Sequence, residues 1–74
     1  MTLLHAVFLV IEAMDEWGED AVSGQEIARI LEEKTTSVYS ALNRLSEQGE
    51  VEREKIRDSN LPPAQNTFYV YYLP

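Results

Sequence analysis

The chain contains no cysteine, one histidine, three glycines and three prolines in 74 residues. Without thiols it can form neither a disulfide framework nor a thiolate metal site, and this absence is typical of proteins from reducing compartments. No apolar run approaches the about 20 residues that a membrane-spanning helix needs. The short apolar run over residues 3–11 is not preceded by the basic residues of a signal peptide. We therefore expect a cytoplasmic protein that makes no membrane contact.

The residue sets on which catalysis depends are also missing from the sequence. There is one histidine, no glycine-rich phosphate loop, and no pair of carboxylates set among apolar neighbours. The acidic residues of the first half show no spacing typical of metal ligands. We expect no enzyme activity, no cofactor and no metal site.

Hydrophobic residues, at 45% of the chain, are sufficient for one packed core, so we expect a single domain over residues 1–74. The net charge of −7 is unevenly distributed. Residues 1–33 carry eight acidic side chains and one basic one, whereas five acidic and five basic side chains balance over residues 34–74. The excess negative charge therefore belongs to the first half.

Apolar residues at three- and four-residue spacing predict a first helix over Thr2–Trp17. Its apolar face is broader than one small core needs. One interpretation is a helix in the middle of the domain; the other is a homodimer surface, because exposed apolar patches mark association. The residues that we assign to this dimer surface are Leu3, Leu4, Val7 and Val10.

Two shorter helices are predicted over Gly24–Glu33 and Thr36–Gln48. Ser23 and Glu26 have the spacing of a capping box at the start of the second helix. Thr35 or Thr36 is expected to cap the third helix, and Gly49 to end it.

Residues 51–57 predict a strand in which basic and acidic side chains alternate between the two faces. Residues 58–66 contain two prolines and predict a loop. The aromatic and β-branched run Thr67–Leu73 predicts a second strand, which pairs with the first as a hairpin. The expected fold is α+β, with three helices followed by a two-stranded antiparallel hairpin.

Three stretches, VSGQEIARILEE, TTSVYSALNRLSEQGEVERE and YVYYL, resemble the winged helix-turn-helix superfamily, in particular transcription regulators of the PadR and MarR kind. The resemblance covers nearly the whole chain and implies a small winged helix, in which the third helix enters the DNA major groove and the hairpin is the wing. The further C-terminal helix or domain that usually dimerises such regulators has no counterpart in the sequence.

The resemblance implies that the exposed positions of the third helix read DNA, with Asn43 suited to adenine and Arg44 to guanine or phosphate. The ring of Tyr39 is expected to pack on the second helix while its hydroxyl donates to a phosphate. The basic side of the wing is expected to contact the DNA backbone. The DNA-binding residues that we predict are Thr36, Ser37, Tyr39, Ser40, Asn43, Arg44, Arg53, Lys55 and Arg57.

Two functions follow from this sequence. The first is a DNA-binding transcription regulator, a homodimer on double-stranded DNA. The second is an acidic winged-helix module that binds a basic protein, such as a polymerase or nucleoid protein, through its N-terminal half. A continuous positive patch on the surface favours the first function, and a patch interrupted by glutamates favours the second.

Overall fold

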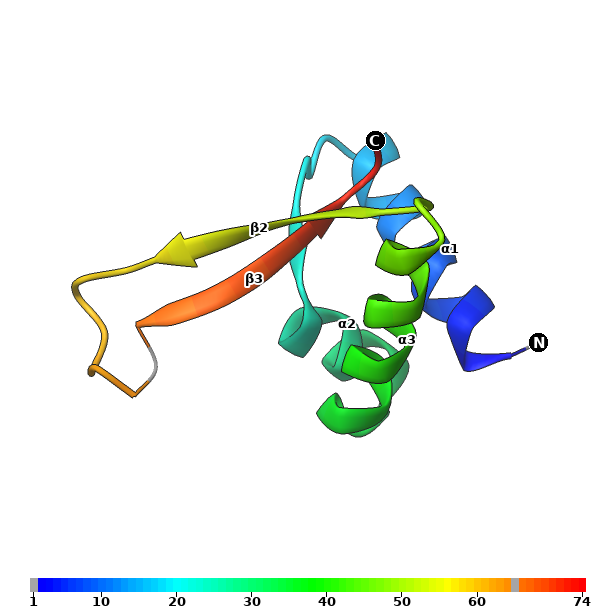
Figure 1. Ribbon diagram of the computed structural model, residues 1–74. Helices are drawn as coiled ribbons and strands as arrows, with labels where there is room; N and C mark the ends of the chain where they lie inside the picture. The colour runs from blue at the N-terminus through cyan, green and yellow to red at the C-terminus, as the bar shows by residue number, and fades with distance from the viewer. Residues whose placement is uncertain (1, 65) are drawn as a thin grey trace.

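The computed structural model describes residues 2–64 and 66–74. Its helices and strands follow in the order α1 (Leu3–Glu16), β1 (Val22–Ser23), α2 (Gly24–Leu31), α3 (Thr35–Glu47), β2 (Glu52–Arg57) and β3 (Thr67–Tyr72). The three helices form a compact group, and the β2–β3 hairpin projects away from them (Figure 1). The projecting hairpin contributes to extents of 37 × 24 × 23 Å.

The sheet has three antiparallel strands in the order β1-β3-β2, so the prediction of a two-stranded hairpin is wrong in strand number. The additional strand β1 pairs Val22 with Tyr71 and Ser23 with Val70. Two residues are too few to show the alternation by which a strand is recognised in a sequence. The β1 pairing joins the start of α2 directly to β3, so the second helix is fixed to the sheet.

One core joins all elements except β2, and Tyr71 of β3 is its largest fully buried side chain. The helices contribute residues at three- and four-residue spacing, as the sequence predicts. Because β2 adds none, most of the hairpin lies beyond the core. The core residues are Val7, Ile11, Val22, Ile27, Ala28, Val38, Ala41, Leu42, Leu45, Val51 and Tyr71.

One of the four residues assigned to a dimer surface is buried in the core. Val7 is 0% exposed within a single chain, so it cannot contact a partner, and its assignment is wrong. Leu3, Leu4 and Val10 are half-buried against the core. Residue spacing identifies the apolar side of a helix but does not distinguish its buried centre from its margins.

The helix ends follow the expected chemistry at two of the three predicted positions. The Ser23 hydroxyl accepts a hydrogen bond from the Glu26 amide at 3.2 Å, as a capping box requires. Gly49 ends α3 with a φ of +76°, and its amide donates to the Ser46 carbonyl. Glu50 completes this Schellman turn by donating to the Leu45 carbonyl at 3.0 Å.

The predicted cap of the third helix is wrong. The N-cap residue is Lys34, which makes no side-chain capping bond, and Thr35 already lies inside the helix. The preceding helix also ends at Leu31, two residues earlier than predicted, because Glu32 takes the left-handed conformation with a φ of +55°. This early turn brings the chain to an extended conformation at Lys34, so α3 starts one residue before the predicted position.

The predicted loop over residues 58–66 joins β2 to β3, and its position 65 lies outside the described residues. Asp58 organises its start, because its carboxylate accepts from the Asn60 amide at 3.0 Å and its carbonyl accepts from the Leu61 amide at 3.2 Å. The Asp58 amide donates to the Asn66 carbonyl at 2.7 Å across the loop. This last bond holds the two strands together at the far end of the hairpin.

Glu32 is expected to be a site of backbone strain, because a non-glycine residue in the left-handed region costs about 1–2 kcal/mol. Glu32→Gly should raise the free energy of unfolding by about 0.5–1 kcal/mol, after the flexibility of glycine in the unfolded chain is allowed for. Thermal unfolding is the measurement. Glu33→Gly is the matched control, since it removes the same charge at the neighbouring position without relieving strain. A Glu32→Gly variant no more stable than Glu33→Gly would contradict this account.

Candidate nucleic-acid interface

The outer side of α3 is a stripe of small polar residues and one carboxylate. The four buried residues of this helix all lie on one side, facing the core. On the opposite side, at the same spacing of three and four residues, the side chains are exposed to solvent. We call this set the α3 stripe; its members are Thr36, Ser40, Asn43 and Glu47.

The remaining predicted residues of α3 flank the stripe. By helical spacing, Ser37 and Arg44 lie on one flank, and Tyr39 lies on the other. Arg44 is exposed, whereas Ser37 and Tyr39 are half-buried. The structure therefore places three of the six predicted residues of this helix in the stripe and three beside it.

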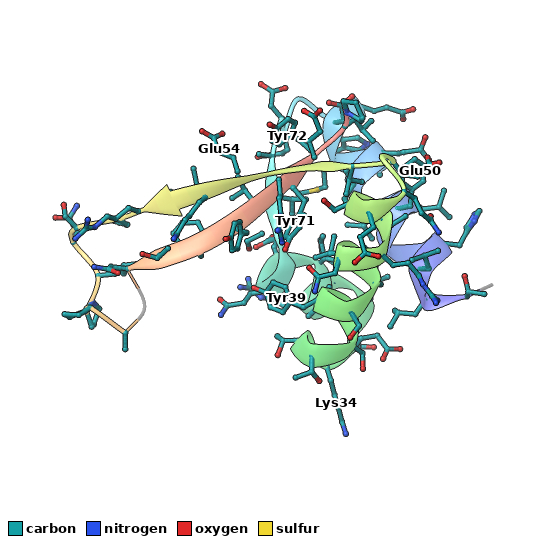
Figure 2. The ribbon with its side chains drawn as sticks, viewed as in Figure 1. Lys34, Tyr39, Glu50, Glu54, Tyr71 and Tyr72 are labelled. Atoms are coloured by element: carbon teal, nitrogen blue, oxygen red, sulfur yellow. The ribbon has the colours of Figure 1, made fainter. Side chains whose placement is uncertain are left out.

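Tyr39 packs against the start of α2, where Gly24 leaves room for its ring. A β-carbon added at Gly24 would lie 2.5 Å from Cε1 of Tyr39, closer than atoms can approach. The glycine therefore permits the contact between the two helices. The ring of Tyr39 packs on the second helix as predicted, and Figure 2 shows the side chain on the helical side of the sheet.

The hairpin separates its charges by face. Arg53 lies opposite Tyr71, Lys55 opposite Tyr69 and Arg57 opposite Thr67. Because cross-strand partners share a face, these basic residues are on the same face as Tyr71, which is 1% exposed and enters the core.

Acidic residues of the hairpin occupy its other face. Glu52 lies opposite Tyr72, and Glu54 lies opposite Val70. In Figure 2, Glu54 and Tyr72 point away from the helices, whereas Tyr71 points toward them. The basic face of the hairpin therefore lies on the helical side, and its acidic face lies on the other side.

Arg53 connects the basic face to the α3 stripe. Its guanidinium carbon lies 4.9 Å from the centre of the Tyr69 ring, a cation–π contact that orients the side chain along the hairpin. Arg53 also lines a hollow of about 300 Å³ together with Asn43, Ser46 and Glu47. The sequence did not predict that Ser46 and Glu47 lie beside Arg53, because the angle between β2 and α3 depends on tertiary packing.

The hydroxyl group of Tyr71 lies near the side chains of Arg53 and Tyr39. Burial raises the pKa of Tyr71 above its usual value of 10.0, and nearby Tyr39 raises it further. The guanidinium of Arg53 acts in the opposite direction, because a positive charge favours the tyrosinate. The three side chains thus meet where the sheet, α2 and α3 come together.

A groove of about 820 Å³ lies between the hairpin and the start of α2. It follows the part of β3 that β1 does not pair with, since β1 reaches only as far as Val70. No sequence signal predicted this groove, because it depends on the β1 pairing. Its lining residues are Ser23, Gln25, Tyr39, Leu61, Ala64, Thr67, Phe68 and Tyr69.

The five basic residues of the second half do not form one continuous surface. Lys34 extends from the end of α3 that is distant from the hairpin (Figure 2). Arg44 lies on the flank of α3 with Ser37, and Glu47, the acidic member of the stripe, lies beside Arg53. Positive charge is therefore concentrated on the hairpin face, and the α3 stripe is polar with one negative charge, that of Glu47.

Comparisons with known proteins identified no relative: no family model matches the chain, and neither a curated protein nor a solved structure matches it. Within residues 2–64 and 66–74, no three histidine, aspartate or glutamate side chains come together as a metal site requires. No helix in this part of the chain combines the length and the apolar character needed to cross a membrane.

The environment of Tyr71 predicts a pH dependence of stability. A tyrosine whose pKa is higher in the folded state contributes stability that is fully present below pH 10.0 and is lost as pH rises through the folded-state pKa. Ultraviolet titration of tyrosinate should show a late ionisation step that belongs to Tyr71. Tyr71→Phe should abolish that late step, whereas Tyr72→Phe should retain it. A late step that survives in Tyr71→Phe would contradict the assignment.

Proposed function

We propose that this protein is a small winged helix that binds double-stranded DNA and regulates transcription. In this proposal, α3 enters the major groove and the β2–β3 hairpin is the wing on the phosphate backbone. The observation that supports it most directly is the charge separation of the hairpin. Arg53, Lys55 and Arg57 share the face directed toward the helical side, and Glu52 and Glu54 share the opposite face.

The side chains of the α3 stripe suit close approach to a groove. Thr36 and Ser40 are short, so they allow the helix backbone to come near base edges and phosphates. Asn43 can donate and accept at once, as pairing with adenine requires. Arg44 reaches phosphate or guanine from the flank of the helix.

The basic residues of the hairpin divide into two roles. Lys55 and Arg57 lie further along the strand, where they neutralise phosphates and release counterions. Arg53 is held by Tyr69 and lies beside Asn43 and Glu47, so it orients the wing relative to α3 as well as contributing charge.

One copy of this interface is expected to bind weakly. The chain carries a net charge of −7, and the Glu47 carboxylate belongs to the stripe itself. A homodimer would bind DNA with higher affinity than one chain, because the second contact becomes intramolecular once the first has formed. Leu3, Leu4 and Val10, which are half-buried along α1, are the residues that we propose for its interface.

A second candidate function is binding to a basic protein. The interrupted basic surface favours it, since Lys34 and Arg44 are separate from the hairpin and Glu47 lies beside Arg53. In this function, the same fold would present its acidic surface to the partner.

The direct test is a fluorescence anisotropy titration of labelled duplex DNA at low salt. The DNA-binding function predicts association at protein concentrations of about tens of micromolar or below, even with a random duplex. Absence of binding to random and candidate duplexes at that concentration would contradict the function.

The wing residues should determine how binding depends on salt. Lys55→Gln and Arg57→Gln should each weaken binding and each reduce the slope of log K against log salt by about 1, the value of one lost phosphate contact. Arg29→Gln is the matched single-charge control, because Arg29 belongs to α2 and lies 3.9 Å from Glu26. An equal change of slope in Arg29→Gln would show that the effect is one of net charge and not of a wing contact.

Glu47 is expected to limit affinity for DNA. Its carboxylate repels a phosphate about 4 Å away by roughly 1 kcal/mol in a well-solvated site, so Glu47→Gln should tighten binding by about fivefold. Glu54→Gln removes the same charge from the opposite face of the hairpin and should change affinity less. If Glu47→Gln leaves DNA binding unchanged or weakens it, α3 does not face the duplex as proposed.

A further inference from the structure

The one tryptophan of the chain is almost fully exposed to solvent. Trp17 stands at the C-terminal end of α1, and its side chain is 86% exposed. It therefore contributes little to the core, in contrast to Tyr71. A tryptophan buries more apolar surface than most side chains when it binds a partner, and it is enriched among the residues that dominate interface energies.

An ordered turn holds Trp17 in place. Its amide donates to the Ala13 carbonyl at 3.1 Å, and the Glu19 amide donates to the Met14 carbonyl at 2.8 Å. Gly18 lies between them with a φ of +91°, and its amide donates to the Asp15 carbonyl at 3.1 Å. This Schellman turn fixes the backbone that carries the indole. Binding at Trp17 therefore costs little conformational entropy of the backbone.

Four exposed carboxylates surround Trp17 in the sequence. Asp15 and Glu16 precede it, and Glu19 and Asp20 follow it. Within the described residues, none of the four forms an ion pair. We call Trp17 with these four residues the Trp17 surface. A partner that covers the indole must also approach the carboxylates, so its own charge determines whether it can bind.

A hollow of about 240 Å³ adjoins this turn. Met14 and Val22 line it together with Glu19 and Glu26. A lysine or arginine side chain places its apolar stem and its charged end in different surroundings. The hollow offers both kinds of contact to such a side chain.

Charge decides among the possible occupants of the Trp17 surface. DNA and anionic membranes carry negative charge and are repelled by the four carboxylates. A second copy docking through the same surface would oppose an identical set of charges. A basic protein surface with an apolar recess is complementary to both the indole and the carboxylates.

We propose that the Trp17 surface binds a basic protein, with the indole in an apolar recess of the partner and lysine or arginine side chains against the four carboxylates. The surface does not use the α3 stripe or the basic face of the hairpin. It therefore does not depend on the proposed DNA binding; it rests on the second candidate function, binding to a basic protein, and names the surface that would carry it.

Fluorescence of Trp17 reports directly on this surface, because the chain has no other tryptophan. The probe is a synthetic amphipathic peptide of leucine and lysine, titrated into the full chain at low salt. We expect a saturable blue shift of the emission as the indole leaves water. Trp17→Ala should weaken binding of the labelled peptide by about tenfold, the loss typical of an interface anchor, without changing the thermal unfolding midpoint.

Two matched variants test the role of charge. D15N/E16Q/E19Q/D20N neutralises the carboxylates of the Trp17 surface, and E32Q/E33Q/E50Q/E54Q neutralises four exposed carboxylates elsewhere. We expect the first variant to bind the peptide at least about tenfold more weakly than the second. Equal affinities would overturn the proposal, because they would show that peptide binding depends on the net charge of the protein and not on the position of the carboxylates.

Other occupants have their own signatures in the same assay. A blue shift with anionic lipid vesicles would indicate a membrane as the partner, and a blue shift with duplex DNA would indicate a nucleic acid. A blue shift with increasing concentration of the protein alone would indicate a second copy. Each of these results would overturn the proposal. Absence of any shift with the peptide would overturn it as well. None of these results bears on anisotropy of labelled DNA with wing variants, so the two proposals fail separately.

Discussion

The burial of Tyr71 determines how the sheet meets the three helices. This residue lies in the central strand, where it pairs with Val22 of β1 on one side and Arg53 of β2 on the other. Its ring is the largest fully buried side chain. Because side chains alternate between the faces of a strand, fixing Tyr71 in the core fixes the face of every other residue in the hairpin.

That constraint determines where the charges lie. A shift of the β2 register by one residue would move Arg53, Lys55 and Arg57 to the outer face and bring Glu52 and Glu54 toward the helices. The basic surface proposed for DNA thus results from the same register that completes the core. The β1 pairing adds the second constraint, because it fixes the start of α2, and with it the position of Gly24 beneath the Tyr39 ring.

The sequence was most informative where local chemistry decides structure. The periods of the three helices, the Ser23 cap and the Gly49 stop depend on neighbouring residues, and the structure confirms each of them. The left-handed conformation of Glu32 was missed, because a glutamate gives no signal for a conformation that glycine favours. The two-residue strand β1 was missed because its pairing partner lies almost 50 residues away.

The candidate site was predictable in its composition but not in its arrangement. Spacing alone placed Arg53, Lys55 and Arg57 on one face of a strand, and the register confirms that they share it. Spacing did not predict that Glu47 lies beside Arg53. That relation depends on how the hairpin meets the helix, and so does the groove along β3.

In the proposed function, the α3 stripe and the basic face of the hairpin form one DNA-binding surface. Chemical-shift mapping of the isotope-labelled protein, titrated with a short duplex at low salt, tests it most directly. We expect the largest perturbations in residues 36–47 and 52–57 and none in the turn that carries Trp17. Perturbations centred on α1 and its C-terminal turn, or none at duplex concentrations of about 0.1 mM, would contradict it.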